Sequence, residues 1–130
     1  METTIILLVD DDSIVRFSIK KIITEYLGHA QFISFASGYD ALDYLENFQS
    51  TDDNCKILIL LDANLPSLMG ERFLPQFEIQ LKAKEELIDL HILTSSTTTE
   101  ESQAILNYDR VKSIIHKPIT FEELKTMLCS

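Results

Sequence analysis

Basic residues are scarce in this sequence. Eleven lysines and arginines stand against 21 acidic residues, which gives a formal net charge of −10. A chain of this charge repels phosphate-rich surfaces, so we expect neither nucleic acid nor an anionic membrane as a direct partner. The charge suits a protein that meets cations or a basic patch on another protein.

Cysteine is also rare, and no apolar run is long enough to cross a bilayer. The two cysteines, Cys55 and Cys129, are not spaced like metal ligands, so we expect no disulfide and a reducing, cytoplasmic environment. A membrane-spanning helix needs about 20 consecutive apolar residues. The apolar run Ile5 to Val9 stops at three aspartates and follows no basic segment, which excludes a signal peptide.

The sequence has no internal repeat and no low-complexity segment. Its 130 residues, 45% of them hydrophobic, suffice for one well-packed core and are too few for two. We therefore expect one domain over residues 1–130, with no separate output domain.

The stretch from Ile57 to Gly70 organises this domain. Its five unbroken aliphatic residues, 57–61, are typical of a strand buried on both faces of a parallel sheet. The run ends at Asp62, and Pro66 then breaks regular structure. Ligands bind beyond the carboxyl ends of the strands in open parallel sheets, so Asp62 is a candidate functional residue.

Strands and helices alternate five times along the chain. Short apolar runs of strand type are each followed by a segment with apolar residues at helical spacing. This order predicts an α/β fold with a doubly wound parallel sheet and helices on both of its faces. The expected strands are 5–9, 31–35, 57–61, 88–93 and 111–115.

Capping residues predict where the helices begin and end. The first helix is expected to begin near Asp12 or Ser13 and to close with a left-handed cap at Gly28. Pro75 is expected to kink or interrupt the third helix. Capping boxes are expected at the start of the second helix, Ser37 with Asp40, and of the last, Thr120 with Glu123.

Four of the five expected strands end in a chemically distinctive residue. These are Asp10 to Asp12 after the first strand, Asp62 after the third, Thr94 after the fourth and Lys117 after the fifth. Parallel strands bring these ends to one edge of the sheet. Two like charges about 4 Å apart repel by roughly 4 kcal/mol near a protein surface, so converging carboxylates require a cation. Oxygen ligands select a hard ion such as Mg2+.

This set of groups predicts phosphoryl transfer to a carboxylate. Asp62 would attack as the nucleophile and form an acyl phosphate, while a metal ion, an ammonium group and a hydroxyl hold the phosphoryl oxygens. In the polar run Thr94 to Thr99, no glycine is present to form an anion nest, so only Thr94 and Ser95 are candidates for phosphoryl contact.

With this set of residues at its strand ends, the chain resembles the receiver domain of two-component response regulators. The resemblance runs from Ile5 to Leu128 and implies a flavodoxin-like, CheY-like fold with strand order 2-1-3-4-5. It depends on four motifs in the expected order at strand ends: Val9-Asp-Asp11, Asp62-Ala-Asn-Leu-Pro66 with Gly70, Leu93-Thr-Ser95 and Lys117-Pro118.

The resemblance also implies a role for each residue of the site. Asp62 would accept the phosphoryl group. Asp11 and Asp62 would bind Mg2+ directly, Asp10 would act mainly through water, and Asn64 would contribute its backbone carbonyl.

The remaining site residues lie on the fourth and fifth strands. By the same resemblance, Thr94 and Lys117 would contact phosphoryl oxygens, and Thr94 would act as a switch. The bond between Lys117 and Pro118 is expected to be cis, which proline permits at small cost.

The resemblance further implies the partners. The phosphodonor would be a histidine kinase or a histidine-phosphotransfer protein, and the signal would pass to another, unidentified protein. We expect a monomer or a weak dimer that is not an enzyme beyond slow self-dephosphorylation.

The sequence departs from the commonest family pattern at Ile114. This position, three residues before Lys117, usually carries an aromatic ring that moves inward behind the switch threonine. We expect the segment from Thr98 to Tyr108, a weakly anchored fourth helix, to shift or become ordered instead.

Three other functions stay open. An aspartyl-phosphate phosphatase of the haloacid dehalogenase type would want an acid two residues after the nucleophile, where Asn64 stands. A flavodoxin-type flavin binder would meet repulsion between its cofactor phosphate and the first aspartates. A receiver-like scaffold that is never phosphorylated would not need Asp11, Asp62, Thr94 and Lys117 together.

Overall fold

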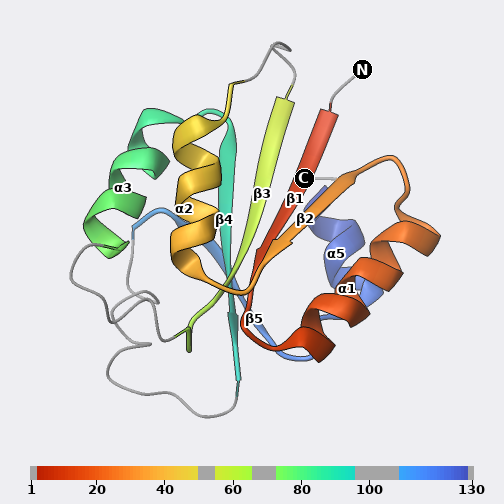
Figure 1. Ribbon diagram of the computed structural model, residues 1–130. Coiled ribbons are helices and arrows are strands. Elements are labelled where there is room, and N and C mark those ends of the chain that lie inside the picture. The colour runs from red at the N-terminus through yellow and green to blue at the C-terminus, as the bar shows by residue number, and fades with distance from the viewer. Residues whose placement is uncertain (1–2, 50–54, 66–72, 96–108, 129–130) are drawn as a thin grey trace.

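The computed structural model of the protein describes residues 3–49, 55–65, 73–95 and 109–128. Five parallel strands form one sheet in the order β2-β1-β3-β4-β5 (Figure 1). The strands are β1 (Thr3–Val9), β2 (Gln31–Phe35), β3 (Cys55–Asp62), β4 (Ile88–Thr94) and β5 (Val111–His116), and the described helices are α1 (Ser13–Tyr26), α2 (Gly38–Asn47), α3 (Phe73–Ala83) and α5 (Phe121–Leu128). The predicted fold class is confirmed, with each expected strand in place and extended by at most two residues at either end.

Strand β3 is the middle of the sheet. It pairs with β1 on one side and with β4 on the other, and Val9 lies opposite Leu61 while Asp62 lies opposite Leu93. Leu60 and Leu61 are completely buried, as the unbroken aliphatic run predicts for a strand covered on both faces. Because β1 and β3 end in register, their terminal acids lie side by side.

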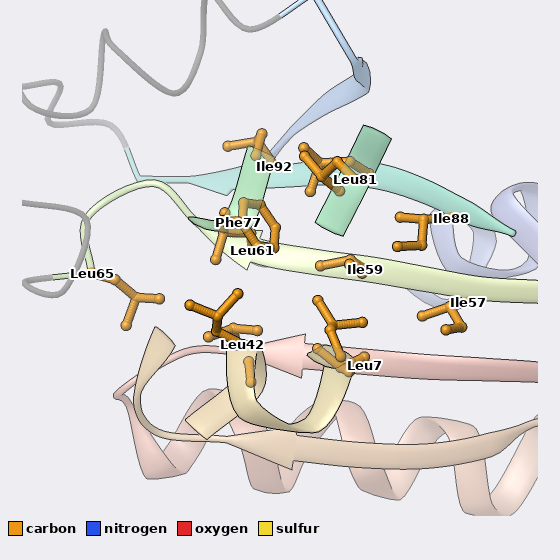
Figure 2. Close-up of a cluster of buried hydrophobic side chains, with 14 of the residues drawn as sticks. Leu7, Leu42, Ile57, Ile59, Leu61, Leu65, Phe77, Leu81, Ile88 and Ile92 are labelled. Carbon is orange, nitrogen blue, oxygen red and sulfur yellow. The ribbon is translucent and has the colours of Figure 1, made fainter. Parts of the chain in front are cut away.

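Alternate side chains of each strand pack into two separate cores. Leu7, Ile59 and Ile92 point to the face covered by α2 and α3, where Leu42 and Phe77 meet them (Figure 2). The other face is covered by α1 and α5, and its core contains Ile6, Leu8, Leu58, Leu60, Ile19, Ile23, Leu124 and Met127.

The helix termini agree with the sequence in part. The Asp12 carboxylate accepts from the Ile14 backbone N–H and caps α1, as predicted. The predicted left-handed cap at Gly28 is wrong, because no described glycine has a positive φ. Helix α1 instead closes through the Leu27 N–H, which donates to the Ile23 carbonyl. Gly28, which follows Leu27, therefore does not adopt the left-handed backbone conformation that favours glycine.

The two expected capping boxes differ from each other. At α5, the Thr120 hydroxyl accepts from the Glu123 N–H, and the Glu123 carboxylate accepts from the Thr120 N–H. At α2, the Ser37 hydroxyl accepts from the Tyr39 N–H. Among the described residues, however, the Ser37 N–H does not donate to the Asp40 carboxylate, so the second hydrogen bond of the box is missing. Only the α5 box is complete.

Two other sequence predictions concern Pro75 and the fourth helix. Pro75 is the third residue of α3 as described, and the helix continues from it to Ala83 without interruption. The expected fourth helix, Thr98 to Tyr108, lies outside the described residues, as do Pro66 and Gly70. Within the ranges that the structure describes, no helix has the length and apolar character needed to span a membrane.

His91 on β4 gives the fold a dependence on pH. Its ring is 3% exposed, Nδ1 shares a hydrogen bond with the Ser113 hydroxyl, and Nε2 has no hydrogen-bond partner among the described residues. Burial lowers the pKa of His91 below its ordinary 6.5, although the Asp89 carboxylate opposes this shift. The imidazole is therefore neutral in the folded protein near neutral pH.

We expect acid to destabilise the protein through this ring. Below about pH 6.5 the unfolded chain binds a proton at His91 more readily than the folded chain, so the free energy of unfolding falls as the pH is lowered. Urea unfolding of the wild type and of His91→Asn at pH 7.5 and pH 5.5 measures this. The loss on acidification should be smaller in the variant, and equal losses in the two proteins would contradict the assignment.

Candidate functional site

Three carboxylates meet at the carboxyl ends of β1 and β3. Asp10, Asp11 and Asp62 each offer one oxygen atom, and these atoms lie within 4.8 Å of one another. Asp10 is completely buried and Asp62 is 3% exposed, whereas Asp11 is exposed. The structure thus brings together the acids that the sequence placed on neighbouring strand ends.

Lys117, just after β5, supplies the positive charge at this edge. Its Nζ lies 2.7 Å from Asp10 Oδ2 and 3.5 Å from Asp62 Oδ1, and its side chain is 21% exposed. Burial by itself lowers the pKa of Lys117, but the hydrogen bond to Asp10 and the charge of Asp62 outweigh it, so the pKa is raised above 10.5. Lys117 is therefore a fixed cation shared by two acids.

The backbone of the β5–α5 connection positions this lysine. The Lys117 N–H donates to the Thr94 carbonyl at 2.9 Å, which continues the pairing of β5 with β4. The peptide bond between Lys117 and Pro118 is cis.

Asp62 has a pKa above its ordinary value of 3.8. Burial is the largest cause, and the neighbouring charges of Asp10 and Asp11 add to it. The Asn64 backbone N–H, which donates to Asp62 Oδ1 at 3.0 Å, and the ammonium of Lys117 act in the opposite direction. The charged carboxylate is thus less favourable here than in water, and a cation would stabilise it.

The loop after β1 is fixed by hydrogen bonds. The Asp10 N–H donates to the Phe35 carbonyl at 3.0 Å, and Asp10 Oδ1 accepts from the Asp12 N–H at 2.9 Å. Asp12 caps α1 and lies outside the group of three acids, as the sequence indicated.

Sequence reasoning missed Arg16, which lies on α1. Its guanidinium Nη1 donates to the Asp10 backbone carbonyl at 2.8 Å. The signal available in the sequence is weak, because a basic residue in the second turn of a helix is ordinarily a solvated one.

The predicted residues of β4 and of the β3 loop lie beside the acids. The Thr94 side chain is buried, and its hydroxyl donates to the Ser95 carbonyl at 3.1 Å. The Asn64 amide donates to the Ser95 hydroxyl at 3.0 Å and so joins the loops after β3 and β4. Thr94, Ser95 and Asn64 therefore line the edge of the sheet next to Asp62.

The donor set fits a divalent cation. It consists of carboxylate oxygens alone, with no histidine or cysteine among the three residues, and such sets favour hard ions such as Mg2+ over zinc. One of the three acids is exposed, which leaves this side of the group open to solvent. The cluster can hold a cation that also contacts an incoming oxygen ligand.

The fold and this edge of the sheet define the class of the protein. A doubly wound sheet of order 2-1-3-4-5, with acids after its first and third strands and a lysine after its fifth, is the arrangement of a CheY-like protein. The chain belongs to the response regulator receiver domain family, whose sequence profile matches residues 6–129. The resemblance inferred from the four motifs is confirmed.

Individual relatives agree with this assignment. The chain is 33% identical over 124 residues to the Probable methanogenesis regulatory protein FilR2 of Methanothrix harundinacea, with 93% of this chain and 76% of that protein covered. A CheY-like receiver domain protein from Methanospirillum hungatei is 25% identical with a TM-score of 0.68, over 95% of this chain and 90% of the other. A receiver protein from Dyadobacter fermentans shares the fold at 20% identity and a TM-score of 0.76, over 97% of this chain and 95% of the other.

The family carries a general function. Receiver domains belong to two-component signalling, act as phosphoacceptors rather than as enzymes, and interact with histidine kinases or phosphotransfer proteins.

Proposed function

We propose that this protein accepts a phosphoryl group on Asp62 from a phosphohistidine, in a Mg2+-dependent reaction, and signals by contact with another protein. The observation that carries the proposal is the group of three carboxylates within 4.8 Å of one another, with Lys117 bound to two of them. We further propose that it has no enzymatic activity beyond slow self-dephosphorylation.

The transfer step needs little from the protein except position and charge. A carboxylate oxygen of Asp62 forms a bond to phosphorus while the bond from phosphorus to the donor imidazole nitrogen breaks, and the imidazole leaves with a proton from water. Lys117 and the hydroxyl of Thr94 would hold phosphoryl oxygens, which requires the Thr94 hydroxyl to leave the Ser95 carbonyl.

Asp11 and Asp62, with the Asn64 carbonyl, would hold the Mg2+ ion directly, and Asp10 would act mainly through water. The bound ion neutralises charge on the phosphoryl oxygens. The raised pKa of Asp62 supports this assignment, because a nearby cation favours the ionised carboxylate that the transfer requires.

Acetyl phosphate tests the proposal without a protein donor. The protein is incubated with acetyl phosphate and Mg2+ and its intact mass is measured. We expect an added mass of one phosphoryl group that hydroxylamine removes and that EDTA prevents. Steady hydrolysis of many phosphate esters would support a phosphatase instead, and no adduct would support an unphosphorylated scaffold.

A cleft beside Lys117 supports docking of the phosphodonor protein on α1. The cleft has a volume of about 200 Å3 and a mainly apolar lining, which includes Ile14, Ile22 and Pro118 as well as Lys117. Beside it on α1, Ile14 is 73% exposed and Phe17 is 69% exposed. An exposed apolar surface next to the acceptor site is suited to contact with another protein.

We expect Phe17→Asp to slow phosphoryl transfer from a protein donor without slowing transfer from the small molecule acetyl phosphate. The charged side chain should lower the rate of transfer from a phosphorylated kinase or phosphotransfer protein about tenfold, since a buried interface anchor is typically worth more than 1 kcal/mol. Transfer from acetyl phosphate should be unchanged. Ile79→Asp is the matched control, because Ile79 is 62% exposed on α3, which covers the other face of the sheet. Equal rates for the two variants with the protein donor would contradict docking on α1.

A further inference from the structure

Asp10 is held through each of its polar groups, and Arg16 supplies the last contact. Its N–H donates to Phe35, Oδ1 accepts from Asp12 and Oδ2 pairs with Lys117. The backbone carbonyl accepts from Arg16 Nη1 at 2.8 Å. Arg16 is half-buried, so this contact is partly shielded from solvent.

The residue that follows, Asp11, has no comparable support. Its side chain is exposed, and among the described residues it makes no hydrogen bond or ion pair. Its carboxylate nevertheless lies within the 4.8 Å group with Asp10 and Asp62. The direction of the Asp11 side chain therefore depends on the peptide unit between Asp10 and Asp11, and the carbonyl of that unit is the group that Arg16 binds.

We propose that Arg16 is a positioning residue for the divalent cation, which acts by fixing the Asp10–Asp11 peptide so that Asp11 faces Asp62. This inference depends on the proposed function, because it assumes that the three acids bind Mg2+. Arg16 itself binds neither the cation nor the phosphoryl group in this proposal.

Charge and geometry predict opposite effects of removing Arg16. Its positive charge lies at the backbone carbonyl of Asp10, one of the three acid residues, and repels a divalent cation, so a role through charge alone predicts tighter Mg2+ binding when the charge is lost. A positioning role predicts weaker binding, because Asp11 then samples directions away from Asp62. The sign of the change in Mg2+ affinity therefore separates the two roles.

The test measures Mg2+ affinity by calorimetry in the absence of a phosphodonor. Arg16→Met keeps the apolar stem and removes the donor and the charge, Arg16→Lys keeps the charge and one donor group, and Lys20→Met removes a charge from an exposed position on the same helix. We expect Arg16→Met to weaken Mg2+ binding roughly tenfold, as for other residues that orient a metal ligand. Arg16→Lys should recover part of the loss, and Lys20→Met should bind as tightly as the wild type or slightly more tightly.

Amide exchange gives a second readout that needs no metal. The Asp12 N–H, which is bonded to Asp10, should exchange faster in Arg16→Met than in the wild type or in Lys20→Met. The inference is overturned if Arg16→Met binds Mg2+ as tightly as the wild type or if Asp12 exchange is unchanged. If the wild type takes up phosphate with Mg2+ but Arg16→Met binds Mg2+ normally, only the role of Arg16 is rejected and the proposed function is intact. If the wild-type protein binds no Mg2+, both proposals are rejected.

Discussion

Asp62→Asn is expected to abolish phosphorylation by acetyl phosphate and, at the same time, to make the folded protein more stable. The amide lacks the charged oxygen that attacks phosphorus, so no acyl phosphate forms. It also removes one of two neighbouring buried carboxylates, Asp10 and Asp62, while its oxygen can still accept from the Asn64 N–H. A loss of function caused by unfolding would show the opposite change in stability.

The sign of the stability change follows from the pKa of Asp62. Because that pKa is raised in the folded protein, the ionised carboxylate lowers stability near neutral pH. We expect the neutral variant to gain on the order of 1 kcal/mol at pH 7.5 in EDTA. The gain should shrink as the pH is lowered through the raised pKa of folded Asp62 toward its ordinary value of 3.8, below which this carboxyl is protonated in both the folded and the unfolded wild type. Urea unfolding at the two pH values measures this, and a destabilised variant at pH 7.5 would contradict the account.

Lys117→Met is expected to cause the largest loss of stability of any variant of the site. It leaves the completely buried Asp10 without its cation, which lies 2.7 Å away in the wild type. Removing one partner of a buried ion pair costs about 3–5 kcal/mol, and the partial exposure of Lys117 places the expected cost at roughly 2–3 kcal/mol.

Added Mg2+ should restore much of this loss. The ion would bring positive charge to the acids that Lys117 no longer neutralises, so Mg2+ should raise the unfolding temperature of Lys117→Met more than that of the wild type. Phosphorylation should stay impaired, because Lys117 would no longer hold a phosphoryl oxygen. The control is Lys125→Met on α5, an exposed lysine with no ion pair to these acids. Equal effects of Mg2+ on Lys117→Met and on the wild type would contradict the shared acid site.

The sheet was predictable because its signals are local. The aliphatic runs ending at Val9 and Leu61 indicate strands that are buried on both faces of a sheet. Because these strands are parallel, Asp10 and Asp62 lie at the same edge of the sheet. The lysine after β5 follows from the same rule. A residue that is chemically distinctive at a strand end is therefore readable from the sequence.

Contacts that depend on side-chain reach were not predictable. Arg16 approaches Asp10 only because α1 folds back beside β1, and the sequence shows it as one more basic residue of a helix. Gly28 resembled a left-handed cap, but the turn through Leu27 and Ala30 closes the helix without a positive φ. Asp40 had the correct spacing for a capping box, and spacing does not ensure that a carboxylate turns back to the helix start.

The chain differs from most receiver domains at a residue of the expected switch, Ile114. Ile114 is 46% exposed on β5, so the position that usually carries an aromatic ring presents an aliphatic side chain to its surroundings. The hypothesis that the segment 98–108 responds to phosphorylation concerns residues outside those described. Backbone amide exchange with and without beryllofluoride and Mg2+ tests it, and unchanged exchange in this segment would reject it.

The most direct measurement of the central claim is the position of the phosphoryl group. The protein is treated with acetyl phosphate and Mg2+, the acyl phosphate is reduced with borohydride, and peptides are sequenced by mass spectrometry. We predict reduction at Asp62, with no such product in Asp62→Asn or without Mg2+. A product at Asp10 or Asp11, or none anywhere in the chain, would contradict the proposal that Asp62 is the phosphoacceptor.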